Sequence, residues 1–168
     1  MVSADVAAPA RAPAVSRWGL VVGLAGAVLA LDQATKWWAL RELPGRVIEL
    51  PWTLQLNLTL NRGTAFGLGS RYAPLIALAA VAVVLVLLGT SRSLDGRFPR
   101  LGVSLVLGGA IGNLADRVFR SGDGVLGGAV VDFIDLQWWP VFNGADAAIC
   151  VGAALLVLTA ARETPAPQ

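Results

Sequence analysis

The sequence predicts a mainly α-helical integral membrane protein, with four transmembrane helices and a small extracytoplasmic β-sheet, or cradle, at the outer membrane surface. The 168 residues are 56% hydrophobic and 14% charged, and the mean hydropathy is +0.68. A soluble domain of this size needs a more highly charged surface. Four long apolar stretches account for the helices, and one segment that alternates between apolar and polar residues accounts for the sheet.

The N-terminal region divides into a tail and a first apolar stretch. Residues 1–16 are rich in Ala and Pro and show no periodicity, which predicts a disordered cytoplasmic tail. Residues 18–40 predict the first membrane span, and Asp32 and Lys36 interrupt it near its end. Because these two residues are spaced i, i+4, they share one face of a helix and can form an ion pair.

A cleavable signal peptide is the alternative for this first stretch. Arg11 and Arg17 would form its basic region, and residues 20–31 its apolar core. Apolar residues resume after Lys36, however, at positions 37–40. This continuation favours a helix that is retained in the mature protein.

Three further apolar stretches predict three more spans. A helix rises about 1.5 Å per residue and needs about 20 residues to cross roughly 30 Å of hydrocarbon. In the third stretch, Gly108 and Gly112 are spaced to allow close helix packing. The expected spans are about 18–40, 72–90, 101–118 and 145–161, within a single membrane domain over residues 17–162 that a cytoplasmic tail over 163–168 follows.

Residues 50–61 alternate strictly between apolar and polar side chains, a pattern typical of a β-strand. A single strand is not stable in water, so it needs a partner. Residues 130–134, which are rich in β-branched side chains and follow Gly127 and Gly128, are the candidate partner. We interpret the pair as a platform on the membrane surface; the alternative is a small sheet with no further role.

Four spans place both termini on one side of the membrane, and residues 41–71 and 119–144 on the other, outer side. The loop after the second span carries Arg92, Arg97 and Arg100, which favours a cytoplasmic position for that loop. Most acidic residues and five of the six Trp residues fall on the outer side. The sequence therefore predicts a functional site at the outer boundary of the membrane.

The composition excludes several kinds of catalytic site. The chain has no His and a single Cys, Cys150, which we expect to be a small core residue. Without His there is no Ser-His-Asp or Cys-His nucleophile and no HExxH zinc site. The chain also lacks a CxxC, a P-loop, a GxGxxG motif and a basic stripe, so we expect no metal, no cofactor and no nucleic-acid partner.

Acidic residues in or beside the apolar stretches are the remaining candidates for chemistry, because carboxylates at membrane depth are costly and mark functional sites. They are Asp32, Asp116, Asp132, Asp135 and Asp146. Two carboxylates that approach one another share a proton, so one can act as general base toward water and the other as general acid. Such a pair could hydrolyse an amide bond without a metal or a covalent intermediate.

Spacing alone leaves the identity of the pair open. Asp116 and Arg117 could instead form an ion pair at a helix end. Asp146 could be a first-turn residue that is favoured by the helix dipole and capped by Asn143. Asp135 would point away from Asp132 on a strand, and we interpret it as a solvated surface charge.

Five short blocks occur in order along the chain. They are Asp32-Gln33-Ala34-Thr35-Lys36, Asn61-Arg62-Gly63-Thr64-Ala65-Phe66-Gly67, Gly109-Ala110-Ile111-Gly112-Asn113-Leu114-Ala115-Asp116-Arg117, Val130-Val131-Asp132-Phe133 and Phe142-Asn143-Gly144-Ala145-Asp146. In these blocks the chain resembles the lipoprotein signal peptidase (signal peptidase II) family of bacterial membrane aspartyl proteases. One departure is Ala147, where the family often has a hydroxyl residue.

This resemblance implies a site as well as a fold. It implies that Asp132 and Asp146 form the catalytic dyad of a four-helix membrane protease domain. It also implies binding or supporting roles for a second set of residues, and no metal. That set comprises Asp32, Lys36, Asn61, Gly63, Phe66, Asn113, Asp116, Arg117 and Asn143.

The resemblance further implies the reaction and its setting. The substrates would be diacylglyceryl-modified prolipoproteins, cleaved at the amide just before the lipidated cysteine, in the bacterial cytoplasmic membrane with the active site facing outward. Membrane lipid and peptide inhibitors of the globomycin type would be further partners. An ion- or proton-coupled transporter and a membrane adaptor without chemistry are the alternatives, but the middle of every span is uncharged and no internal repeat is evident.

Overall fold

A computed structural model describes residues 17–63, 73–90, 96–120 and 126–163. The predicted tails lie outside these ranges except for Glu163, which belongs to the last helix and not to a tail. Each of the four apolar stretches forms a helix, and the helices extend one to four residues beyond most of the expected bounds. The elements in chain order are α1 (Arg17–Glu42), β1 (Val47–Glu49), β2 (Gln55–Asn61), α2 (Ala73–Thr90), α3 (Arg97–Phe119), β3 (Val130–Asp135) and α4 (Gly144–Glu163).

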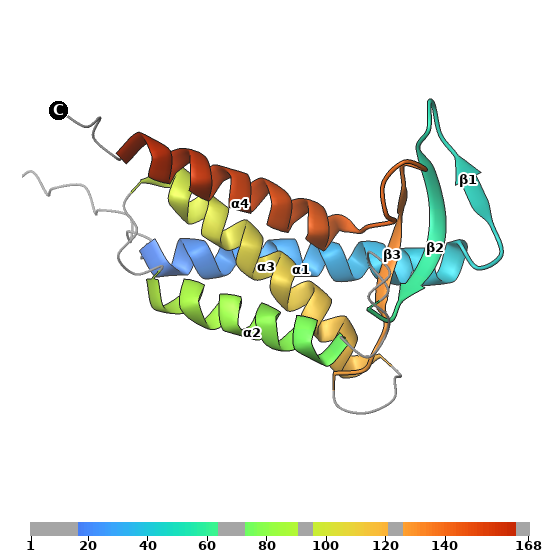
Figure 1. Ribbon diagram of the computed structural model, residues 1–168, viewed down its shortest axis with the longest axis horizontal. Helices are drawn as coiled ribbons and strands as arrows, with labels where there is room; N and C mark the ends of the chain where they lie inside the picture. Colours follow the sequence, from blue (N-terminus) through green and yellow to red (C-terminus); the bar gives the residue numbers. More distant parts are fainter. Residues whose placement is uncertain (1–16, 64–72, 91–95, 121–125, 164–168) are drawn as a thin grey trace, which may run out of the picture.

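The helices form an elongated bundle, and the sheet lies across one end of it (Figure 1). α1 and α3 end at the sheet, and α4 begins there, so three helix termini and a strand converge on one region. The start of α1 and the end of α4 both lie at the opposite end of the bundle. Described residues of all five sequence blocks therefore lie toward the sheet end of the molecule.

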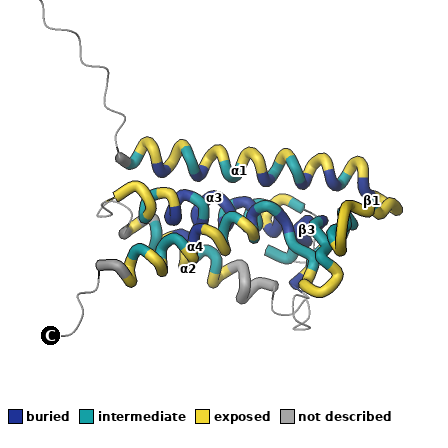
Figure 2. Tube along the Cα trace, turned by 90° about the horizontal axis from the view of Figure 1, so that it is seen from above, coloured by how far each residue is buried: buried dark blue, intermediate teal, exposed yellow. Residues whose placement is uncertain are grey.

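Among the described residues, three helices are long and apolar enough to cross a membrane: α1, α3 and α4. α2 contributes a shorter apolar segment over its described residues, Leu78–Leu87, which falls below that length. The prediction of four spans is thus supported for three helices. α1 turns one side to the surroundings and the other to the bundle, as the alternating colours in Figure 2 show.

α3 is the central helix and packs against α1, α2 and α4. Glycines make this close approach feasible, as the spacing of Gly108 and Gly112 predicted. A Cβ atom on Gly108 would lie 2.7 Å from the carbonyl oxygen of Ala25, and one on Gly109 would lie 2.5 Å from that of Ala145. Both distances are shorter than van der Waals contact, so any larger residue would push α1 or α4 away from α3.

The predicted pairing of the alternating segment with residues 130–134 is confirmed. The sheet has the order β1-β2-β3, with antiparallel neighbours. Register places Thr59 opposite Asp132 and Asn61 opposite Val130, with an irregularity between Leu56 and Thr59. Pairing with β3 is therefore what brings the end of β2 beside Asp132.

The prediction of one continuous strand over residues 50–61 is wrong in its first half. β2 begins only at Gln55, and a turn closed by a hydrogen bond from Leu50 N–H to Leu54 C=O (2.9 Å) connects it to the short β1. Trp52 in this turn has a positive φ of 71°. Alternation of residue types continues through the turn, but a positive φ is incompatible with extended backbone.

The interpretation of Cys150 as a core residue is also wrong, because its side chain is exposed on α4. Apolar sequence around a residue predicts burial only in a soluble protein. In a helix that crosses a membrane, apolar residues face lipid as well as protein, so composition does not distinguish the two faces. α4 exposes Val151, Val157 and Leu158 in the same way.

Candidate active site

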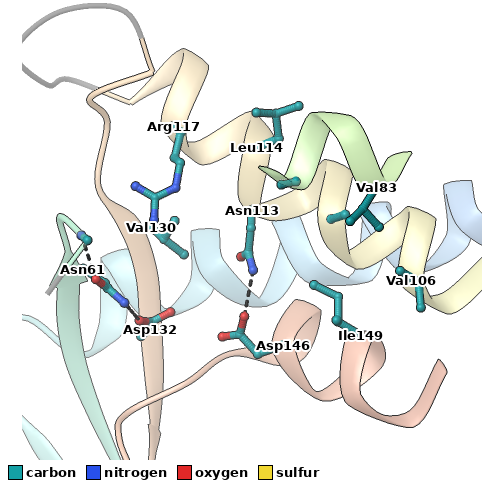
Figure 3. Close-up of a pocket in the computed structure, with 13 residues that line it drawn as sticks. Asn61, Val83, Val106, Asn113, Leu114, Arg117, Val130, Asp132, Asp146 and Ile149 are labelled. Carbon is teal, nitrogen blue, oxygen red and sulfur yellow. Dashed lines mark hydrogen bonds between the residues drawn. The ribbon is translucent and has the colours of Figure 1, made fainter. Parts of the chain in front are cut away.

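Asp132 and Asp146 lie on different elements, and Asn143 connects them. Asp132 belongs to β3 and is 2% exposed, whereas Asp146 lies in the first turn of α4 and is half-buried. The side-chain amide of Asn143 donates to Asp132 Oδ1 (2.7 Å), and its backbone N–H donates to Asp146 Oδ2 (3.1 Å). Both carboxyl groups line the same cavity (Figure 3). The structure thus places the two predicted dyad residues side by side.

Asn143 also caps α4, as predicted. It precedes the first residue of the helix, and its Oδ1 accepts a hydrogen bond from the backbone N–H of Asp146 (3.0 Å). With the reverse bond from Asn143 N–H to the Asp146 carboxylate, the two residues satisfy each other in the manner of a capping box. The cap fixes where the Asp146 side chain emerges from the helix.

Two further amides complete the hydrogen bonding of the two carboxyl groups. Asn61 Nδ2 donates to Asp132 Oδ2 (2.9 Å), and Asn113 Nδ2 donates to Asp146 Oδ1 (2.8 Å). Every oxygen of the pair therefore accepts at least one N–H. Such donors orient each carboxyl group without neutralising it, because an amide carries no charge.

The environment of Asp132 raises the pKa of its carboxyl group from the ordinary 3.8 to about 6. Burial is the largest cause, since it removes the water that would solvate the anion. The negative charge of Asp146 also raises this pKa, while hydrogen bonds from Asn61 and Asn143 oppose the shift. A carboxyl group with a pKa of about 6 retains its proton over part of the range in which ordinary aspartates are ionised.

A buried ion cluster adjoins the pair through Asn113 and is centred on Lys36, which is 0% exposed. Its ammonium group lies 2.9 Å from Asp32 Oδ2 and 3.0 Å from Asp116 Oδ2, and it donates to Asn113 Oδ1 (2.8 Å). The predicted pairing of Asp32 with Lys36 is confirmed. Two carboxylates and an amide oxygen satisfy all three ammonium protons, which is the condition for burying such a charge.

Asp116 does not form the alternative ion pair with Arg117. Its carboxylate contacts Lys36 and Arg120 Nε (2.7 Å) instead. Adjacent residues on a helix point in different directions, whereas residues four apart share a face, which favours Arg120 over Arg117. The side chain of Arg117 instead lines the cavity.

The acidic members of the cluster also hold the elements that carry the dyad. Asp116 Oδ2 accepts from the backbone N–H of Val131 (3.1 Å), the residue before Asp132. Asp32 Oδ1 accepts from the backbone N–H of Ala145 (3.1 Å), the residue before Asp146. Each carboxylate thus ties one dyad-bearing segment to the helix bundle.

Gln33 is a member of this cluster to which we assigned no role from the sequence. Its side-chain amide lies within hydrogen-bond distance of Asp32 Oδ2 (3.1 Å), of the carbonyl of Gly112 (3.2 Å) and of Asp116 Oδ1 (3.3 Å). Its place inside the first sequence block was the signal that could have indicated it. Arg120, which lies outside the blocks, carried no such signal.

The cavity has a volume of about 340 Å³ and combines a polar end with an apolar wall. Arg117 lines the polar end and is 7% exposed; within the described part of the chain, its Nη1 is a buried polar atom without a hydrogen-bond partner. Its charge interacts with the carboxylates of Asp132, Asp116 and Asp146. The apolar wall comes from three helices and comprises Ala80, Val83, Val106, Ala110, Leu114 and Ile149.

The remaining predicted site residues fall in two groups. Gly63 is buried, lines the cavity and donates its N–H to Asn61 Oδ1 (2.9 Å), whereas Phe66 lies outside the described residues. Asp135 stays apart from the pair, as expected, and accepts from the backbone N–H of Gln137 (2.7 Å). Over the described ranges, no group of three or more Cys, Asp or Glu side chains is arranged to hold a metal ion.

Comparison with known proteins relates this site to an enzyme family. Residues 24–162 match the family described as signal peptidase (SPase) II. The chain belongs to the signal peptidase II family. It is 45% identical over 141 residues to the lipoprotein signal peptidase of Rhodococcus jostii, covering 83% of this chain and 71% of that protein. It is 41% identical over 144 residues to that of Mycobacterium leprae, covering 84% and 71%.

A solved structure of a bacterial membrane enzyme has the same fold, with a TM-score of 0.74 and 26% identity. The match covers 89% of this chain and 95% of that one. Together with the apolar helices, this likeness identifies a multi-pass membrane protein. Membership of the signal peptidase II family makes it a protease.

Proposed function

We propose that this signal peptidase is a membrane aspartyl endopeptidase that removes signal peptides from diacylglyceryl-modified prolipoproteins. It would cleave the amide bond just before the lipidated cysteine. The observation that carries the proposal is the pair Asp132 and Asp146, bridged by Asn143 and open to one cavity. The lipoprotein signal peptidases to which the chain is similar support the choice of substrate.

In the proposed reaction, a water molecule lies between the two carboxyl groups. Asp146, half-buried and at the N-terminus of α4, takes a proton from the water as the oxygen attacks the scissile carbonyl carbon. Asp132 supplies its proton to the carbonyl oxygen, which gives a tetrahedral gem-diol. Asp146 then passes the proton it took from water to the amide nitrogen, and Asp132 regains a proton from one hydroxyl as the carbonyl re-forms and the C–N bond breaks. The products are a new carboxyl group on the signal peptide and a free amine on the cysteine.

Arg117 is suited to stabilise the charge that develops on the carbonyl oxygen. Its Nη1 is buried at the cavity without a hydrogen-bond partner in the described residues. An unpaired buried donor is costly, and a substrate carbonyl would satisfy it. Because a guanidinium is always protonated, this donor would be present over the whole working pH range.

The setting of the cavity supports an apolar substrate. Its wall of Ala, Val, Leu and Ile side chains continues from the dyad along the helices, so the hydrophobic part of a signal peptide could remain in lipid beside it. We further propose that α2 is a fourth span and that the sheet is a cradle at the outer surface of the cytoplasmic membrane. The exposed Trp52, Trp138 and Trp139 around the sheet favour such an interface.

The test is to replace Asp132 and Asp146 separately by Asn and to measure cleavage of a purified diacylglyceryl prolipoprotein. Each substitution removes one partner of the acid–base pair, so kcat should fall by roughly 10³-fold or more. Asp135→Asn is the matched control, because Asp135 is an aspartate on the same strand that does not contact the pair. Thermal unfolding in detergent should show that all three variants remain folded.

Two results would reject this function. Retained cleavage in either variant would show that the pair is not catalytic. If wild-type protein fails to cleave the prolipoprotein while remaining folded, the chain would be better explained as a membrane adaptor, in which the aspartates only bridge helices.

A further inference from the structure

Lys36 is a buried charged residue that the proposed hydrolysis does not use. It does not line the cavity, and its three ammonium protons are directed at Asp32, Asp116 and Asn113. Asp32 and Asp116 explain how the charge is tolerated. The third contact leads toward the dyad, because the other end of the Asn113 amide donates to Asp146.

The chemistry of lysine decides which way the Asn113 amide points. An ammonium group can only donate, so the Asn113 atom that lies 2.8 Å from it must be the carbonyl oxygen. The NH₂ group of Asn113 is then directed at Asp146 Oδ1, 2.8 Å away, as Figure 3 shows. Reversing the amide would place NH₂ against the ammonium and an oxygen against the carboxylate, which is unfavourable at both ends.

A second donor fixes the neighbouring amide in the same way. The backbone N–H of Asp146 requires the oxygen of Asn143, so the NH₂ group of Asn143 faces Asp132 Oδ1 and Asn113 Oδ1 (3.1 Å). The Asn113 oxygen therefore accepts from both Lys36 and Asn143. The Lys36 ammonium thus orients the Asn113 amide, and the Asp146 backbone N–H orients the Asn143 side-chain amide. As a result, the NH₂ group of Asn113 faces Asp146 and that of Asn143 faces Asp132.

We propose that Lys36 is a positioning residue, which holds the Asn113 amide so that its N–H stabilises the anionic form of Asp146 and keeps the negative charge of the dyad on that residue. This inference rests on the proposed function of the dyad. Asp146 has a second N–H donor in the Asn143 backbone and lies at a helix N-terminus. Asp132, almost wholly removed from water, is then the carboxyl group that keeps the proton.

Charged groups approach Asp146 from three elements. Asp132 approaches from β3 and Arg117 from α3. Behind Asn113 lies Lys36 of α1 with its partners Asp32 and Asp116, while the described cavity-lining residues of α2 are the apolar Ala80 and Val83. Arg117 also attracts the charges on Asp132 and Asp116, and Lys36 attracts the charge on Asp132 as well. Each of the two carboxyl groups accepts two N–H bonds, and the one from Asn113, which Lys36 orients, goes to Asp146 alone.

A double-mutant cycle tests this link in the full-length protein with a diacylglyceryl prolipoprotein as substrate. Lys36→Met should lower kcat about tenfold or more while KM stays within about twofold, because substrate contacts are unchanged. In an Asn113→Leu background, the same substitution should change kcat by less than about twofold, since the amide through which it acts is absent. If Lys36→Met lowers kcat by the same factor in the wild-type and Asn113→Leu backgrounds, the two residues act independently and the proposal is overturned.

Arg120→Gln is the matched control for the ion cluster. It removes a cation from Asp116 but leaves the contact between Lys36 and Asn113 intact, so kcat and its pH profile should stay near those of the wild type. A loss of kcat equal to that of Lys36→Met would indicate that only the cluster's stability matters, and would overturn the proposal. Thermal unfolding in detergent separates lost stability from lost catalysis.

A second variant covers the case in which Lys36→Met does not fold. Asn113→Asp keeps an oxygen for Lys36 but replaces the N–H that faces Asp146 by another oxygen, so the acid limb of the kcat profile should move to higher pH. An unchanged profile would contradict the proposed orientation.

A second measurement needs no substrate: the ¹³C chemical shift of the Asp146 carboxyl carbon, whose resonance is assigned by its loss in Asp146→Asn. At neutral pH it should report a carboxylate in wild type and move toward the protonated value in Asn113→Asp, even if prolipoprotein proves not to be the substrate.

Discussion

At the scale of single residues, Asp132 shows how the fold changes the chemistry of an ordinary side chain. The strand buries it almost completely, and the nearby charge of Asp146 adds to the cost of ionising it. Asn61 and Asn143 orient the carboxyl group without supplying a compensating charge. The proton on Asp132 is therefore stabilised by the folded state.

This environment predicts a stability that depends on pH. Because the folded-state pKa of Asp132 is about 6 and the ordinary value is 3.8, the folded protein binds the extra proton between those values. The stabilisation is fully present below about pH 3.8 and is lost as pH rises through about 6. Relative to Asp132→Asn, the wild type should lose roughly 1–3 kcal/mol of unfolding free energy between pH 4 and 7.

The measurement is the difference in thermal stability between wild type and Asp132→Asn in detergent across that pH range. The substitution also disturbs the hydrogen bonds from Asn61 and Asn143, but this adds an offset that does not vary with pH. A difference that is flat with pH, or that rises, would contradict a raised pKa for Asp132.

At the scale of elements, the turn between β1 and β2 is the part of the sheet that packing does not explain. The strands themselves pack Leu56 and Leu58 against Val131 and Phe133. Trp52 in the turn, by contrast, is 100% exposed and has a positive φ. A positive φ is energetically unfavourable for a bulky residue, so we infer that the Trp52 ring is retained for contact with lipid or substrate.

Trp52→Gly should separate stability from function. Glycine adopts a positive φ without strain, so thermal stability should be unchanged or slightly higher. Loss of the ring should raise KM for a diacylglyceryl prolipoprotein in lipid bilayers by about threefold or more, with kcat within about twofold. Trp52→Phe, which keeps an apolar ring, is the control and should stay closer to wild type; equal kinetics for all three proteins would remove the platform interpretation.

At the scale of the whole molecule, the arrangement separates two ends of different character. The sheet, the dyad and the ion cluster lie at one end of the bundle, and the start of α3 lies at the other. Apolar side chains of α1 and α4 face outward along the length between them. Such a molecule can present its site at only one surface of the membrane at a time.

We expect the sheet end to face outward, and cysteine labelling in intact cells tests this. In a Cys150→Ser background, Glu49→Cys on β1 should react with a membrane-impermeant maleimide. Arg97→Cys, at the start of α3, should react only after lysis. Both positions are exposed, so access and not burial decides the result. The reverse pattern would place the site in the cytoplasm.

The sequence by itself determined the helices, the sheet partner and the candidate residues, because apolar length, alternation and the helical i, i+4 spacing are local signals. It identified Asp32 with Lys36 and the cap at Asn143 for that reason. It did not predict the turn at Trp52, because the alternation of apolar and polar residues does not determine the sign of a backbone φ angle. It also did not predict that Cys150 is exposed.

Only the tertiary structure decided how the candidates contact one another. Asp132 and Asp146 meet because Asp116 ties Val131 to α3 and Asp32 ties Ala145 to α1, contacts that join segments 15 and 113 positions apart. The direction of the Asn113 amide, and hence its N–H toward Asp146, depends on Lys36 from another helix. The local sequence determines which side chains are available. Hydrogen bonds between distant segments determine how close the two carboxyl groups lie and which of them is more readily ionised.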